Sequence, residues 1–284
     1  MQIQMSSSVC NPGMQRQSGL RNPLPWVLLF VACVVVLCGC AGTPSSDAAG
    51  ADIVTDSDES DQHRRARIRV ELAASYFEQG QATVALDEIK QALAADPGYS
   101  PAHNLRGLVY MQLNDSRQAQ ESFQRALALN PRDSDTLHNY GWFLCTQQRY
   151  NESMEFFARA LANPGYTRQA NTYMARGICY IRSGDRQQAE QSLSRAYELD
   201  PSNPIVGYNL SHLLFQRSEL ERSQFIVRRI NNSELANAQT LWLGIKVEFR
   251  LKNMEAMAQL GEQLLKRYPQ SQQAASWRRK AYDE

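Results

Sequence analysis

The sequence predicts an all-α fold, a superhelix of about six stacked helix–turn–helix repeats, because prolines recur along it at a nearly constant spacing. Asp96-Pro97 and Asn130-Pro131 lie 34 residues apart, and Asn163-Pro164 and Asp200-Pro201 follow after 33 and 37 residues. A proline that follows a helix cannot continue it and so ends the unit. An internal spacing of this length is typical of helix pairs that bury their apolar faces only by stacking on their neighbours.

Small residues recur within each repeat where the two helices of a pair would cross. Gly107, Gly141 and Gly177 occupy one such position, and Ala119 and Ala189 occupy another in the helix that follows. Small side chains let two helix backbones approach towards the short end of the roughly 8–10 Å range of interaxial distances. Large side chains at neighbouring offsets fill the space beside the crossing. This set of shared offsets resembles the tetratricopeptide repeat.

The resemblance divides residues 64–284 into six repeats and a cap. The repeats are expected at 66–99, 100–133, 134–169, 170–203, 204–237 and 238–271. Residues 272–284 are expected to form a capping helix that packs Trp277 on the last repeat and turns Arg278, Arg279 and Lys280 to water.

Residues 1–39 are predicted to be a signal peptide. The apolar run from Trp26 to Leu37 has 12 residues, whereas a spanning helix needs about 20. Its length suits the apolar region of a secretory signal, and Arg16 and Arg21 supply the positive charge that precedes such a region.

The end of the apolar run resembles a bacterial lipobox. In Leu37-Cys38-Gly39-Cys40 the leucine and glycine stand at the positions that precede a lipidated cysteine, so Cys40 is expected to carry covalent lipid. Ordinary signal cleavage near a cysteine is the alternative. Ala41 is not the aspartate that retains lipoproteins at the inner membrane, and the resemblance therefore implies the outer membrane. Residues 40–63 are expected to form a flexible tether, since 41–61 contain six acidic residues and no basic one.

The composition favours a protein-binding module over an enzyme or a nucleic-acid-binding protein. The chain has 30 Lys and Arg against 29 Asp and Glu and no basic stripe with interleaved aromatic residues. No metal-ligand spacing, phosphate-binding loop or nucleophile motif is present in the sequence. We therefore expect no cofactor, no small-molecule substrate and no nucleic acid. Cys145 and Cys179 are expected to be free thiols, because neighbouring first helices are usually too far apart for a disulfide.

The surface that remains is the concave side, which the first helix of each repeat lines in tetratricopeptide arrays. Apolar side chains occupy most of the expected lining positions in repeats one to four, and packing between neighbouring helices is the alternative for some of them. A contiguous groove of methionine and aromatic side chains usually marks a partner site. The candidate groove residues are Val70, Phe77, Leu108, Met111, Trp142, Met174 and Ile178.

The whole layout resembles one lipoprotein family. Its telling stretches are LHNYGWFLCTQQRYNESMEFFARAL (137–161) and TLWLGIKVEFRLKN (240–253), the latter followed by LLKRYP (264–269). They are similar to the pilotin lipoproteins of type IV pilus biogenesis, the PilF/PilW family. The resemblance implies a non-enzymatic protein anchored in the inner leaflet of the outer membrane, with its repeats in the periplasm. Its groove would hold the type IV pilus secretin subunit and promote secretin localisation and multimerisation.

Two alternatives to this function remain. One is a tetratricopeptide-repeat lipoprotein that acts as a scaffold for cell-wall enzymes or for outer-membrane protein assembly. The other is a periplasmic hydrolase, which the missing nucleophile motif disfavours.

The lipobox makes the first testable prediction. Replacing Cys40 by alanine removes the atom that would be acylated, so the variant should lose incorporated fatty acid and be depleted from the outer-membrane fraction. Metabolic labelling with a fatty acid measures the first effect. Undiminished label in the Cys40→Ala protein contradicts the lipobox.

Overall fold

The computed structural model describes residues 59–282 of the 284-residue chain. The predicted signal peptide, the predicted lipidation site Cys40 and most of the predicted tether lie outside this range. The described residues fold into helices joined by turns, with no strand among them, and confirm the all-α prediction. No helix in residues 59–282 is long and apolar enough to cross a lipid bilayer.

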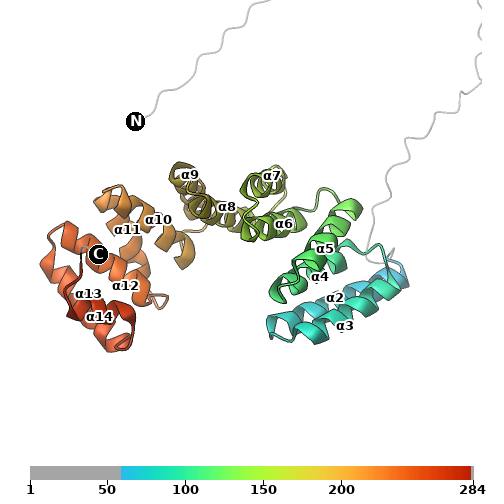
Figure 1. The fold of residues 1–284 in the computed structure, drawn as a ribbon, viewed down its shortest axis with the longest axis horizontal. Coiled ribbons are helices and arrows are strands. Elements are labelled where there is room, and N and C mark those ends of the chain that lie inside the picture. The colour runs from blue at the N-terminus through green and yellow to red at the C-terminus, as the bar shows by residue number, and fades with distance from the viewer. Residues whose placement is uncertain (1–58, 283–284) are drawn as a thin grey trace, which may run out of the picture. The chain divides into compact units, whose positions relative to one another are not determined.

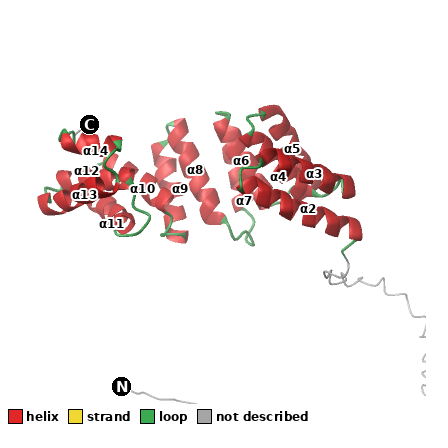
Figure 2. Ribbon diagram, turned by 90° about the horizontal axis from the view of Figure 1, so that it is seen from below, coloured by secondary structure: helices red, strands yellow, loops and turns green. Residues whose placement is uncertain are grey.

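Six helix pairs follow one another along the chain, and a short helix closes the array (Figures 1 and 2). The first helices are α2 (Asp61–Glu78), α4 (Ser100–Gln112), α6 (Ser134–Thr146), α8 (Gln169–Ser183), α10 (Pro204–Gln216) and α12 (Ala238–Arg250). The second helices are α3 (Ala82–Ala95), α5 (Ser116–Leu129), α7 (Tyr150–Leu161), α9 (Arg186–Leu199), α11 (Leu220–Asn231) and α13 (Met254–Arg267), and the closing helix is α14 (Gln272–Arg278).

The two ends of the array differ in detail from the sequence prediction. Helix α2 begins at Asp61, inside the predicted tether 40–63, because the Ser60 hydroxyl caps it by accepting a hydrogen bond from the His63 amide at 3.1 Å. The closing helix ends at Arg278 rather than continuing to 284. Beyond it Tyr282 folds back, with its ring 5.0 Å from that of Phe249.

Local signals define each helix pair. In repeats two, four and six the second helix is capped by the side chain of Asp115, Asp185 or Asn253, which accepts from a backbone amide three residues further on. The turn between the helices of a pair always contains a residue with positive φ. It is glycine in repeats one and four; elsewhere the residues are Asn114, Gln148, Ser218 and Lys252.

The small residues lie where the helices of a pair cross, as predicted. A Cβ atom added to Gly107 would lie 2.6 Å from the Phe123 ring, and one added to Gly141 would lie 2.9 Å from the Phe157 ring. Gly177 meets Leu193 in the same way at 2.6 Å. These partner side chains are fully buried. Each first helix thus offers a gap that a large side chain of its second helix fills.

The first helices form the inner side of the array. Helices α2 and α4, α4 and α6, α6 and α8, and α10 and α12 pack directly on one another, whereas successive second helices make no comparable contact. An array whose first helices lie closer together than its second helices curves towards the first helices. The contact between α8 and α10 is weaker than between any other two successive first helices.

The crossings make the second prediction. Gly141→Leu should place a side chain against the buried Phe157 ring and destabilise the protein by about 1–3 kcal/mol. Repeats three and four should loosen most, since coupling in such arrays runs between neighbours. A circular-dichroism melt with hydrogen exchange measures both effects.

Gly165→Leu is the control, because Gly165 lies in an exposed loop where an added Cβ atom meets only the Asn163 side chain at 3.5 Å. An unchanged melt for Gly141→Leu would contradict the role of the crossing.

Candidate functional surfaces

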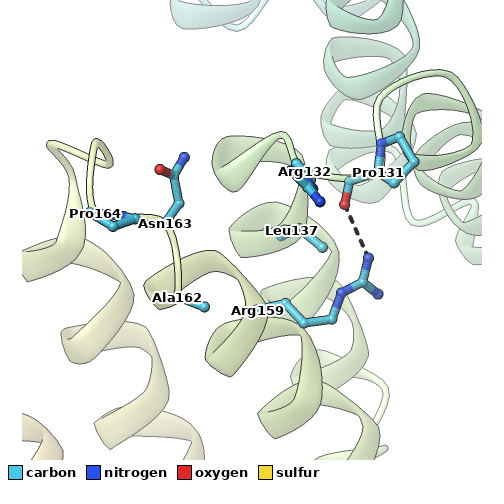
Figure 3. Close-up of a pocket in the computed structure, with 7 residues that line it drawn as sticks. All are labelled: Pro131, Arg132, Leu137, Arg159, Ala162, Asn163 and Pro164. Carbon is cyan, nitrogen blue, oxygen red and sulfur yellow. Dashed lines mark hydrogen bonds between the residues drawn. The ribbon is translucent and has the colours of Figure 1, made fainter. Parts of the chain in front are cut away.

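A cavity lies at the loop edge of repeats two and three, and no residue of the predicted groove lines it (Figure 3). Its volume is about 570 Å³, and its lining includes Pro131, Arg132, Leu137 and Pro164. Arg159 closes one side by donating a hydrogen bond to the carbonyl oxygen of Pro131 at 3.1 Å. The lining has no carboxylate, imidazole, hydroxyl or thiol side chain, so it offers no acid–base pair or nucleophile.

Metal binding finds no support in the part of the chain that the structure describes. Within residues 59–282, no three histidine, cysteine, aspartate or glutamate side chains come close enough together to hold an ion.

All the predicted groove residues lie on first helices, on the inner side of repeats one to four. Val70 and Phe77 come from α2, Leu108 and Met111 from α4, Trp142 from α6, and Met174 and Ile178 from α8. Every one is half-buried. We call this set the early inner surface; its use in binding stays a prediction.

Several of these side chains are half-buried because they pack on the core. Val70, Phe77 and Leu108 pack against the buried core of the first two repeats. Met111 packs beside Phe123. These side chains serve the core with one edge and leave the other accessible, so packing and partner contact are compatible here.

Trp142 occupies the middle of the early inner surface. Its side chain packs on the buried cluster that includes Cys145, Phe157 and Cys179. The guanidinium of Arg182, on the next first helix, lies 4.9 Å from the ring centre, a cation–π contact. The core and Arg182 together hold the ring in place.

Polar side chains connect neighbouring first helices beside these apolar residues. Asn139 on α6 donates to the Asn104 side chain on α4 at 3.1 Å, and His138 on α6 lies 2.9 Å from the Thr172 hydroxyl on α8. Burial lowers the pKa of His138 to about 4, so the imidazole is neutral at pH 7. These contacts hold the inner helices in register.

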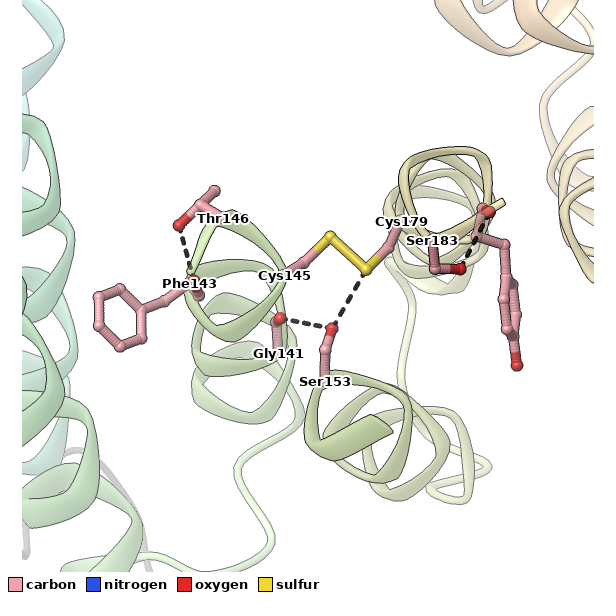
Figure 4. Close-up of a disulfide and its surroundings, with 8 residues drawn as sticks. Gly141, Phe143, Cys145, Thr146, Ser153, Cys179 and Ser183 are labelled. Atoms are coloured by element: carbon pink, nitrogen blue, oxygen red, sulfur yellow. Dashed lines mark hydrogen bonds between the residues drawn. A yellow bond between two sulfur atoms is a disulfide. The ribbon is translucent and has the colours of Figure 1, made fainter. Parts of the chain in front are cut away.

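A disulfide joins Cys145 on α6 to Cys179 on α8 (Figure 4). Both cysteines belong to the buried cluster on which Trp142 packs. The prediction of free thiols was wrong. The Cα atoms lie 5.9 Å apart, because α6 and α8 pack directly on one another. The Ser153 hydroxyl lies 3.6 Å from the Cys179 sulfur and 2.7 Å from the Gly141 carbonyl oxygen, which links the bridge to the crossing within repeat three.

The last two repeats have an inner side as well, which was not among the predicted sites. Helices α10 and α12 present Tyr208, His212, Phe215, Trp242, Lys246 and Arg250 there, a set that we call the late inner surface. Four of these residues, Tyr208, His212, Trp242 and Lys246, line a small cavity of about 80 Å³. Continuing the repeat numbering into repeats five and six would have identified all of them but Arg250, since the other five occupy the same positions as the early residues.

Comparison with known proteins identifies the repeats independently. Models of the tetratricopeptide repeat match residues 70–115, 104–167 and 170–203. The Pseudomonas aeruginosa type IV pilus assembly protein PilF is 25% identical over 202 residues, which cover 71% of this chain and 80% of that protein.

Solved structures of type IV pilus proteins are similar to this chain as well. The crystal structure of PilW, described as a widely conserved type IV pilus biogenesis factor, superposes with a TM-score of 0.66 at 30% identity and covers 74% of this chain and 97% of PilW. The structure of Pseudomonas aeruginosa PilF gives a TM-score of 0.71 at 23% identity, covers 77% of this chain and 99% of that one, and shows the shared fold.

The disulfide makes the third prediction. It closes a loop with a sequence separation of 34, for which the chain-entropy model assigns about 4 kcal/mol of stabilisation. The Cys145→Ala/Cys179→Ala variant should therefore melt at a lower temperature than the native protein. Reductant should lower the melting temperature of the native protein towards that of the variant, and it should leave the melting temperature of the variant unchanged. A native melt that neither the substitutions nor reductant alters would contradict a stabilising bridge.

Proposed function

Because this chain belongs to the PilF/PilW family of tetratricopeptide-repeat proteins of type IV pilus biogenesis, we propose that it is a non-enzymatic assembly factor that binds the pilus secretin subunit. The early inner surface holds a segment of that subunit. Binding brings the secretin to the outer membrane and promotes its multimerisation, so that the completed ring lets the pilus through.

The observation that carries this proposal is the continuous row of half-buried apolar side chains on the inner side of repeats one to four. Phe77, Met111 and Trp142 lie on three successive first helices, each held by the core on one side. Side chains held in place lose little conformational entropy on binding, which favours affinity. Large apolar side chains at the centre of an interface contribute most of its binding energy.

Lipid anchoring at Cys40 would place the repeats on the periplasmic side of the outer membrane. The acidic stretch 41–58 would then connect the lipid to α2. Anchor and groove have separate roles in this proposal, since the anchor sets the location and the groove selects the partner.

The fourth prediction concerns Trp142. Truncation of an aromatic side chain at an interface centre costs about 2–4 kcal/mol, so Trp142→Ala should weaken binding of detergent-solubilised secretin subunit roughly 30-fold or more. Phe225→Ala is the matched aromatic control, because Phe225 is 70% exposed on α11, a second helix, and its loss should leave binding unchanged.

Melting curves separate binding from packing. Weak binding with a native melt supports the groove, whereas weak binding with a lowered melt assigns Trp142 to the core. In cells that carry only the Phe77→Ala/Met111→Ala/Trp142→Ala variant, secretin should stay monomeric. Normal heat-resistant multimers there would refute the groove mechanism.

A further inference from the structure

The late inner surface carries positive charge without a counter-ion. Lys246 and Arg250 both lie over the Phe215 ring, at 5.6 Å and 5.7 Å from its centre. Neither cation forms an ion pair with a carboxylate of residues 59–282, and the hydrogen bond that Arg250 makes is to the Ser218 hydroxyl at 3.4 Å. Two cations over one ring repel each other, and a carboxylate between them would relieve that repulsion.

Carboxylates of the last repeats lie elsewhere. Glu190 and Glu219 form ion pairs with Arg217, and the buried Glu248 carboxylate accepts from Arg228 at 2.7 Å. The lining positions of α10 and α12 contain no acidic residue. The late inner surface therefore has two cations on one aromatic ring and no carboxylate beside them.

Aromatic side chains surround these cations. The Tyr208 and His212 rings stack at 6.0 Å, and Trp242 lines the same small cavity as both of them and Lys246. Burial lowers the pKa of Lys246, and burial together with Lys246 and Arg186 lowers that of His212. The surface thus combines partly desolvated positive charge with stacking faces.

We propose that the late inner surface binds an acidic segment of a partner protein, with carboxylates that meet Lys246 and Arg250 and an aromatic side chain that stacks near Trp242. This inference goes beyond the proposed secretin contact, because it concerns other repeats and other chemistry. The two inner surfaces share no helix, since the early one lies on α2, α4, α6 and α8 and the late one on α10 and α12.

A partner is a better occupant than this chain's own acidic stretch. That stretch precedes α2 and so joins the array at repeat one, and it would have to pass repeats one to four to reach α10 and α12. The two carboxylates that follow the stretch are already engaged, since Glu59 accepts from Arg67 at 3.1 Å and Asp61 pairs with Arg64 at 3.5 Å.

The test uses the full chain and a short fluorescein-labelled peptide in which aspartate alternates with phenylalanine. Fluorescence anisotropy measures its dissociation constant over a salt series. Lys246→Glu/Arg250→Glu should weaken binding by about tenfold or more at low salt, and the effect should shrink as salt screens the charges. Lys246→Gln/Arg250→Gln should weaken peptide binding by less. Because this variant removes the charges without reversing them, a loss of binding in it cannot come from misfolding caused by charge reversal.

The matched control is Arg229→Glu/Lys266→Glu. It makes the same charge change at exposed residues of α11 and α13 in the same two repeats, and should leave the dissociation constant unchanged. The early-surface variant Phe77→Ala/Trp142→Ala should also bind the peptide normally, which keeps this test separate from that of secretin binding.

Four results would overturn the proposal. One is equal loss of binding in the Lys246/Arg250 and control variants, and another is equal affinity for a peptide with lysine in place of aspartate. The third is tighter peptide binding after Asp52, Asp56 and Asp58 are changed to asparagine, which would make the chain's own stretch the occupant. The fourth is binding to phosphatidylglycerol vesicles that depends on Lys246 and Arg250 while the peptide does not bind.

Discussion

The close crossing of two helices within each repeat is the constraint on which the rest of the structure depends. Where Gly107, Gly141 or Gly177 lacks a side chain, the buried ring or branched chain of the second helix fills the gap. This contact fixes the angle within a pair. Because every pair presents a similar face to the next one, the same angle is repeated, and the first helices come together along one side.

The crossings therefore create the inner side. The chemistry of that side is set by first-helix residues that take no part in the crossings. Those residues have one edge against the core and one edge free. In repeats one to four they are mostly apolar, and one of them, Trp142, packs on the buried cluster that contains the disulfide between α6 and α8. In repeats five and six they are aromatic and cationic. One scaffold thus presents two kinds of surface along a single side.

The late inner surface differs from the early one in the residues at its centre, which are two cations that share one aromatic ring. Arg217 and Arg228 face carboxylates across helix boundaries. Lys246 and Arg250 face an aromatic ring instead. A cation over a ring keeps much of its field, because the ring attracts it without neutralising it. The late inner surface can therefore attract an acidic partner over a longer range than an apolar groove can.

The sequence by itself determined the repeat length, the helix pairs and the small residues at the crossings. These features follow from local spacing, because side chains three or four residues apart share one face of a helix. The inner placement of the early apolar residues was implied by the resemblance to the tetratricopeptide repeat. The left-handed conformation of Gln148 and Lys252 in the turns carries no signal in the residue type.

The tertiary structure alone decided which side chains from different repeats meet. The 5.9 Å distance between the Cα atoms of Cys145 and Cys179, the half-burial of Trp142 and the shared ring beneath Lys246 and Arg250 all depend on the distance between first helices of neighbouring repeats. That distance is set by the summed packing of whole helix pairs. No spacing along the chain encodes it, and for this reason the disulfide and the late inner surface emerged only from the folded array.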